Sequence, residues 1–294
     1  MTSYALLGAL EQGLLYGIMA LGVYLTFRIL NFPDLTVDGS LPLGAAVSAM
    51  VITSGHSPYL ALGLATLAGF GAGVVTALLN TKLKILHLLA SILTMIALYS
   101  INIRIMGSPN VALLGTPSIL TDLEALGLPL YQAGPICFFL LTTLVTGLLI
   151  WFLHTEYGQA MLATGDNKQM ITALGVNTDQ VILVGVGLSN ALVAFSGALI
   201  AQNQGAADVN MGVGTIVAGL ASVILGETLL GTTTVARACV AAVVGSLAYR
   251  LAIALALSLR LGDFSFTPSD LNLITSVLVI LALTAPKIKQ RMRP

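Results

Sequence analysis

Charged residues are scarce in this sequence. Its 294 residues include 12 lysines and arginines and 12 aspartates and glutamates, or 8% of the chain, against about 25% in soluble domains. Aromatic residues make up only 6%, whereas hydrophobic residues make up 57% and the mean hydropathy is +0.97. A formal net charge of zero gives no indication of nucleic-acid binding. The composition predicts an all-α polytopic membrane protein that spans a lipid bilayer.

Motifs for catalysis and nucleotide binding are also absent. The sequence has no G-x-x-x-x-G-K-[ST] loop, so ATP cannot bind by that route, and no H-E-x-x-H zinc motif. Cys137 and Cys239 are isolated in apolar stretches, and the three histidines are scattered. We expect no catalytic residue, metal site or cofactor in this chain. A membrane-embedded enzyme therefore ranks last among the possible functions.

Apolar stretches that could cross a bilayer, which takes about 20 residues each, recur along the chain. We predict nine transmembrane helices, at 5–27, 36–53, 59–80, 85–106, 134–153, 179–202, 213–230, 234–257 and 269–286. The second and seventh follow polar, glycine-rich sequence, and the second contains Pro42. We expect both to be broken or partly unwound, which membranes tolerate only where protein or water covers the freed backbone.

Basic residues predict how these helices are oriented, because cytoplasmic loops are enriched in lysine and arginine. If the polar stretch after the fifth span is cytoplasmic, nine of the twelve basic residues face the cytoplasm. These are Arg28, Lys82, Lys84, Lys168, Arg237, Lys287, Lys289, Arg291 and Arg293. The N-terminus is then expected outside and the C-terminus inside.

A weak internal repeat relates the two halves of the chain. Asp34-Leu-Thr-Val-Asp38-Gly39 precedes one short apolar helix, and Asp208-Val-Asn210-Met-Gly-Val precedes another that runs in the opposite direction. Inverted repeats with broken helices are common in transporters, although two Gly/Ala-rich spans can also align by chance. We predict a single transmembrane domain over 1–294. Its parts are repeat one at about 5–106, a connector helix at 134–153, a loop at 154–178 and repeat two at about 179–286.

The polar stretch 157–177 is the longest interruption of the apolar sequence. Asp166 or Asn167 can cap a helix start, and Gly175 can end a helix in the left-handed conformation. Between them Met170, Ile171 and Leu174 fall on one helical face. Such a helix could bind a groove on a soluble partner or simply rest on the membrane surface.

Polar residues within or beside the apolar spans are the candidates for a translocation pathway, because a polar group in hydrocarbon needs a partner or water. Each could instead make a helix-to-helix contact, or cap a helix as the two aspartates before span two could. The pathway candidates are Asp34, Asp38, Gly39, Asn190, Asn203, Asp208 and Asn210. Glu11 and Arg250 are further intramembrane ionisable residues.

An external platform for a partner is predicted at 107–134, the longest segment on the outer side. It contains a possible surface helix at 118–126, which Ser118 would cap. A plain connecting loop is the alternative.

Three stretches resemble a known family. They are Asp34-Leu-Thr-Val-Asp-Gly-Ser40, Ala163-Thr-Gly-Asp-Asn167 followed by Ala173-Leu-Gly-Val176, and Leu220-Ala-Ser-Val-Ile-Leu-Gly226. Together they resemble the transmembrane permease subunits of bacterial ABC importers, in the branch with ribose-type and branched-chain amino-acid permeases. The resemblance extends from about residue 5 to 286, and the middle stretch is its most specific part.

The resemblance implies a permease subunit of an ATP-driven importer in the bacterial plasma (inner) membrane. In the family, the middle stretch is a coupling helix that binds a groove of the cytoplasmic ATPase. This assigns ATPase coupling to Gly165, Asp166, Asn167, Met170, Ile171, Ala173, Leu174 and Gly175. The implied partners are a cytoplasmic ABC ATPase dimer, which binds ATP and Mg, an extracytoplasmic solute-binding protein and a second permease copy.

Departures from the family pattern point to a divergent subgroup. Leu162 replaces the usual arginine before the coupling stretch, and Glu227 stands where a second glycine is usual. Aromatic amino acids have been suggested as ligands in subgroups of this kind, so an amino acid is one candidate solute. The rival hypothesis is a stand-alone secondary carrier or channel with inverted repeats, which would depend on Glu11 or Arg250 for energy coupling.

Overall fold

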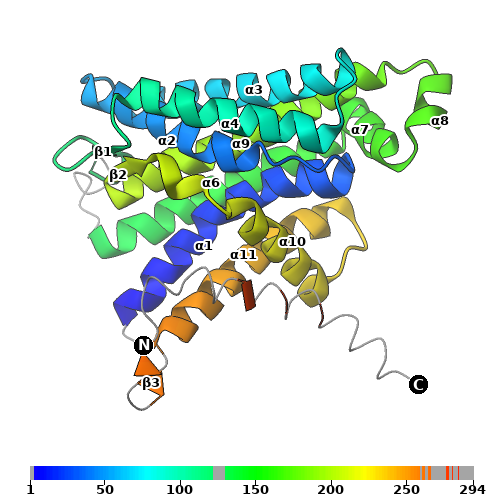
Figure 1. The fold of residues 1–294 in the computed structure, drawn as a ribbon. Helices are drawn as coiled ribbons and strands as arrows, with labels where there is room; N and C mark the ends of the chain where they lie inside the picture. Colours follow the sequence, from blue (N-terminus) through cyan, green and yellow to red (C-terminus); the bar gives the residue numbers. More distant parts are fainter. Residues whose placement is uncertain are drawn as a thin grey trace, which may run out of the picture.

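A computed structural model describes residues 3–121, 130–258, 260–261, 264–265, 276–277, 280 and 284, which form a helical bundle (Figure 1). Within this part, seven helices are long and apolar enough to cross a membrane. Six of them are α1 (Ser3–Tyr24), α3 (Pro58–Thr81), α4 (His87–Met106), α6 (Leu130–Leu153), α9 (Thr178–Gln204) and α11 (Val235–Ser258), and the seventh is Val209–Leu230, which contains a 3₁₀ turn followed by α10 (Thr215–Leu230). The predicted ninth span, 269–286, lies outside the described residues except at four positions.

Helices α1 and α9 form the centre of the bundle. The most apolar window of α9 is 72% buried and that of α1 is 61% buried, against 28% for α4. Hydroxyl groups join the two helices, since Ser189 donates to the Gly22 carbonyl and Ser196 to the Leu15 carbonyl, each over 2.7 Å. On either side of this pair, α9 packs against α3 and α1 packs against α11. Close approach of small residues, such as Gly69 against the Asn190 backbone, supports this packing.

Helix α2 (Val37–Thr53) is apolar but has only 17 residues. It is continuous through Pro42, so the predicted break within span two is wrong. The irregular backbone lies ahead of it, over residues 30–36, after α1 has continued into the π-helical turn η1 (Leu25–Ile29). The amide that Pro42 lacks would have bonded to the Asp38 carbonyl, and Gly212 packs directly against that carbonyl.

The predicted break at span seven is confirmed. A 3₁₀ turn, η2 (Val209–Gly212), is followed by Val213 and Gly214 before α10 begins. Gly214 has φ +76°, a left-handed conformation that residues with a Cβ atom adopt only at a cost. The chain therefore changes direction at this glycine.

The polar stretch after α6 contains two helices rather than the one predicted. These are α7 (Glu156–Asp166) and α8 (Lys168–Ala173), which project from one end of the bundle (Figure 1). The opposite end carries a two-stranded antiparallel sheet of β1 (Asn110–Ala112) and β2 (Ala206–Asp208). A second short pair, β3 (Arg260–Leu261) with β4 (Phe264–Ser265), follows α11.

Ser118 behaves as predicted at the start of the proposed surface helix, because its hydroxyl accepts a hydrogen bond from the Thr121 amide over 3.3 Å. Most of that helix, from residue 122, lies outside the described residues.

Candidate functional site

The N-termini of α2 and α10 meet at the carboxylate of Asp38. This side chain, in the first turn of α2, accepts hydrogen bonds from the amides of Gly214 (3.1 Å) and Ile216 (2.8 Å). It also accepts one from the hydroxyl of Thr215 (3.0 Å). Asp38 therefore caps α10, and the expectation that it caps its own helix is wrong.

Electrostatics explains why a carboxylate lies here. Each helix N-terminus carries a partial positive charge and unpaired amides. Two such ends that meet within a membrane would repel each other, and Asp38 compensates both, since it lies within one helix and bonds to the other. The residue thus joins the two segments that the sequence identified as a repeat.

Asp34 and Asn190 form a second, fully buried network beside this junction. The Asn190 amide donates to Asp34 over 2.7 Å and accepts from the Ser40 hydroxyl over 2.7 Å. The other Asp34 oxygen accepts from the Thr36 amide over 2.9 Å. Because Asn190 is near the middle of α9, the irregular segment before α2 reaches the interior of the bundle. Asn190 therefore joins α9 to α2 through Ser40 and to the irregular segment through Asp34, a structural contact of the kind that the sequence left open as an alternative.

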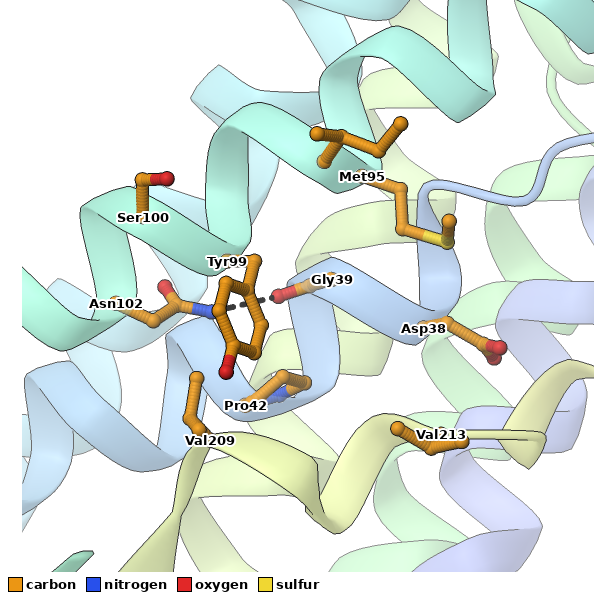
Figure 2. A pocket seen from close by; sticks show the side chains of 10 residues that line it. Asp38, Gly39, Pro42, Met95, Tyr99, Ser100, Asn102, Val209 and Val213 are labelled. Atoms are coloured by element: carbon orange, nitrogen blue, oxygen red, sulfur yellow. Dashed lines mark hydrogen bonds between the residues drawn. The ribbon is translucent and has the colours of Figure 1, made fainter. Parts of the chain in front are cut away.

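A cavity of about 420 Å³ lies between α2, α4 and η2 (Figure 2). Asp38, Gly39 and Pro42 line it from α2, and Tyr99 and Asn102 are among its residues from α4. The Asn102 amide donates to the Gly39 carbonyl over 3.2 Å. Its side-chain oxygen is buried and has no partner among the described residues. The cavity thus combines apolar walls with a carboxylate and an amide, as small-molecule sites do.

The three outer candidates lie elsewhere. Asp208 accepts from the Asn210 amide over 2.7 Å and from the Asn110 side chain over 3.3 Å, and so stabilises the η2 turn and the β1–β2 sheet. Asn203 is hydrogen-bonded to Glu11. None of the three lines the cavity at Asp38. The structure thus brings Asp38 and Gly39 together in one site and leaves Asn203, Asp208 and Asn210 outside it.

At the α7–α8 end, the predicted capped helix is present. The Asn167 side chain accepts from the Met170 amide over 3.0 Å, and Gly175 has φ +87°. The predicted single apolar face is wrong, because Ile171 is 6% exposed whereas Met170 is 50% and Leu174 is 72% exposed. Ile171 faces the protein, and the other two are free to contact a partner.

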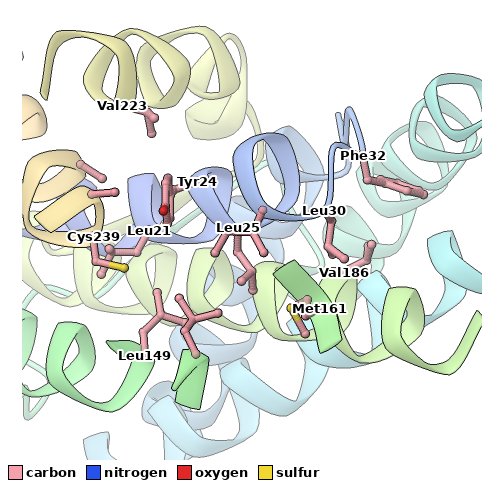
Figure 3. Close-up of a cluster of buried hydrophobic side chains, with 14 of the residues drawn as sticks. Leu21, Tyr24, Leu25, Leu30, Phe32, Leu149, Met161, Val186, Val223 and Cys239 are labelled. Carbon is pink, nitrogen blue, oxygen red and sulfur yellow. The ribbon is translucent and has the colours of Figure 1, made fainter. Parts of the chain in front are cut away.

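Helix α7 is anchored in the bundle. Met161 is fully buried in an apolar cluster with Leu25, Leu30 and Leu149 (Figure 3). A Cβ atom at Gly165 would overlap the carbonyl oxygen of Ile29, so α7 packs directly on the π-helical turn. Outside the spans, Tyr157 donates to the Gln180 carbonyl, and partial burial raises the pKa of its phenol.

Two arginine contacts were not foreseen. Arg28 makes a two-pronged ion pair with Glu227, in which Nε lies 2.7 Å from Oε1. This pair gives Glu227, which stands where the family usually has glycine, a structural role, because it fixes the end of α10 to the π-helical turn that continues α1.

Arg250 contacts the Tyr16 ring at 3.5 Å rather than a carboxylate. Intramembrane polarity could have identified Asn102, which sits in an apolar helix. No sequence signal paired Arg28 with Glu227.

Among the described residues, no group of three or more His, Cys, Asp or Glu side chains could hold a metal ion. The apolar helices of the bundle, with two helix N-termini meeting among them and a capped helix exposed at one end, indicate a multi-pass membrane protein. The chain belongs to the family described as branched-chain amino acid transport system / permease component, whose model matches residues 5–284.

Relatives with assigned roles agree with this family. The chain is 41% identical to the tyrosine transport system permease protein of Clostridioides difficile, over 94% of this chain and 89% of the relative. It is 27% identical to the autoinducer 2 import system permease protein LsrC of Yersinia enterocolitica, over 74% of this chain and 59% of that protein. The chain is therefore similar along most of its length to permease subunits of import systems.

One solved structure has a similar fold. It is reported as an inward-facing conformation of a metal-chelate type ABC transporter, and it matches with a TM-score of 0.53 at 16% identity. The match covers 97% of this chain and 85% of that one. At this identity the likeness concerns the fold alone.

Proposed function

We propose that this chain is the permease subunit of an ATP-driven importer for a small solute, and that α8 binds a separate ATPase. The observation that carries the proposal is the contrast between α8 and α7. Helix α8 exposes Met170 and Leu174 to solvent, while α7 is fixed to the bundle through Met161 and Gly165. An apolar helix face in water is suited to a groove on a partner.

The packing supports a mechanical route from α8 to the site. Helix α7 rests on the π-helical turn η1, and the chain continues from η1 through the irregular segment to Asp34 and α2. The first turn of α2 holds α10 through Asp38. A displacement of α8 by the ATPase would therefore move the two helix ends that border the cavity.

The proposed solute is an amino acid. The relative named for tyrosine transport supports this choice. So does the cavity, which offers the Tyr99 ring, the Asp38 carboxylate and the free oxygen of Asn102. Aromatic and apolar walls with few polar groups are suited to an amino-acid side chain of moderate size.

The arrangement of subunits is part of the proposal. Two permease copies would form the pathway at their interface, and a binding protein would deliver the solute to the outer face. The ATPase dimer would bind ATP and Mg, and this chain would perform no covalent chemistry. We place the chain in the bacterial inner membrane with α7 and α8 in the cytoplasm. Helix α1 packs against α11 in the same way as α9 packs against α3, with the two helices antiparallel in each pair, and this correspondence supports an inverted repeat.

Purification from native membranes in mild detergent, with the co-purified chains identified by mass, tests the proposal. We expect an ATPase with a phosphate-binding loop to accompany the wild-type chain and to be lost from the Leu174→Asp variant. A chain that purifies without an ATPase, from membranes that contain one, would refute the proposal and favour the carrier hypothesis. In that case Glu11→Gln should abolish transport.

A further inference from the structure

Arg250 is an intramembrane cation with no anionic partner among the described residues. It lies within α11, about 22 Å along the axis from the start of the helix and about 12 Å from its end. The ion pairs found in the described part of the chain are Arg28 with Glu227 and Lys168 with Asp179. A charge at this depth is costly unless it faces other groups or a water-filled cavity, and such residues commonly mark a pathway.

The contacts that Arg250 does make are weak. Its Nη1 lies 3.5 Å from the side-chain oxygen of Gln12, at the limit of a hydrogen bond. Its guanidinium stacks on the Tyr16 ring, which orients the group without neutralising its charge. Its Nε is buried and has no hydrogen-bond partner among the described residues. Several of its five donors are therefore left for a ligand.

Arg250 lines a second cavity, of about 420 Å³. It is lined by Tyr16, Val213, Gly214, Thr215, Arg250 and Ile253, among others. Val213 also lines the cavity at Asp38, so the two cavities adjoin at the break before α10. Gln12 and Val213 are exposed on this side of the described bundle. A cavity within the membrane that has a cation and a hydroxyl group in its wall is suited to solute passage rather than to contact with lipid.

We propose that Arg250 binds the carboxylate of the transported solute in this cavity; the inference rests on the proposed function. Arginine is suited to this role, because its planar fork can donate two parallel hydrogen bonds to a carboxylate. A solute that enters from the predicted outer side would pass Arg250 at the break that Asp38 holds.

The test uses the complete importer in proteoliposomes, with permease, ATPase and saturating binding protein, and radiolabelled L-tyrosine as the probe. Arg250→Met keeps the length of the side chain and removes its charge. We expect this variant to lower uptake by about tenfold or more, while ATP hydrolysis stimulated by the binding protein continues. Arg250→Lys should retain part of the uptake. Arg237→Met, a matched change at the exposed start of the same helix, should leave uptake unchanged.

Chemical rescue separates charge from packing. In an Arg250→Cys variant, a thiol reagent that attaches an aminoethyl group should restore part of the uptake, and one that attaches a neutral methyl group should not. Cys137 and Cys239 are buried, and treated wild type is the control for them. This variant also replaces Arg250→Met if the latter does not fold.

Three outcomes would overturn the inference. The first is wild-type uptake by Arg250→Met. The second is a joint loss of uptake, stimulated ATP hydrolysis and thermal stability, because a structural cation or one that holds a lipid phosphate would affect all three. The third is the absence of ATP-dependent uptake by the wild-type importer. That result appears before any variant is compared, so it identifies a failure of the proposed function itself, and the inference falls with it.

Discussion

The two ends of the proposed coupling route differ in how they are built. The junction of α2 and α10 is held by three hydrogen bonds to the half-buried carboxylate of Asp38. Helix α8 is exposed except for Ile171, and its cap, Asn167, is the residue next to it in sequence. The junction thus depends on contacts between residues far apart in sequence, whereas α8 is stabilised by a neighbouring residue and leaves Met170 and Leu174 exposed. Substitutions at the two places should therefore affect stability and transport in different proportions.

The largest effect is expected where the two regions join, at Gly165. We predict that Gly165→Trp prevents folding, because any side chain there overlaps the Ile29 carbonyl. The assignment of Gly165 to ATPase coupling would by itself predict a variant that folds and loses only transport, whereas the packing on η1 predicts a loss of folding. Fluorescence-detected size-exclusion chromatography of the tagged chain should show no monodisperse peak. Gly147→Trp, on an open face of α6, is the control. A folded Gly165→Trp protein would contradict the packing of α7 described here.

A smaller but still large effect is expected at Asn190. We predict that Asn190→Leu lowers the free energy of unfolding by about 3 kcal/mol, since it leaves Asp34 and Ser40 buried without their partner. Thermal unfolding in detergent measures this change, and Asn210→Leu, at an exposed position, should have little effect. If Asn190→Leu matches the control in stability, the buried network does not stabilise the bundle.

At Asp38 the expected loss is intermediate. Asp38→Ala removes the cap of α10, and we predict a loss of about 2 kcal/mol together with loss of uptake. Asp38→Asn keeps an acceptor and should lose less than half as much, so the pair separates hydrogen bonding from charge. Asp166→Ala, at an exposed carboxylate, is the control for thermal unfolding. Equal stability of Asp38→Ala and wild type would show that α10 does not need this cap.

The smallest effect on stability is expected at Leu174. We predict that Leu174→Asp changes the free energy of unfolding by less than about 0.5 kcal/mol, because the side chain is 72% exposed. The same variant should lose the ATPase and all ATP-dependent uptake. Ile171→Asp, on the buried side of the same short helix, should instead destabilise the chain. Wild-type uptake by Leu174→Asp would contradict the assignment of α8 to coupling.

Some of this architecture could be predicted from local sequence. The caps at Asn167 and Ser118 and the left-handed glycine at 175 depend on neighbouring residues, and the structure confirms all three. The apolar stretches predicted most of the described helices to within a few residues, because hydrocarbon requires continuous backbone hydrogen bonding. The exception is α7, which was not predicted. The bounds of α2 were predicted well, but Pro42 was read as a break; the helix continues through it, and Gly212 packs against the freed carbonyl.

The candidate site was predictable only in part. Asp38 was identified as a polar residue beside an apolar span, but its bonds to Gly214 and Ile216 cross about half the chain. The buried side of α8 was assigned wrongly, because spacing places residues on a face and only packing decides which face is covered. The sequence analysis named Arg28 and Glu227 separately, and no local pattern indicates that they form an ion pair.

The sequence by itself predicted a helical membrane protein with two polar segments beside short apolar spans and a capped helix after the fifth span, and its motifs resembled those of permease subunits. Hydropathy and helix capping depend on residues that are close in sequence, so they can be read without knowing the fold. Only the tertiary structure decided that Asp38 caps α10, that Asp34 contacts Asn190 and that Arg250 lacks an anionic partner among the described residues. Those contacts depend on which helices meet at the same depth in the bundle. Residues far apart in sequence contain no local pattern that indicates such a meeting.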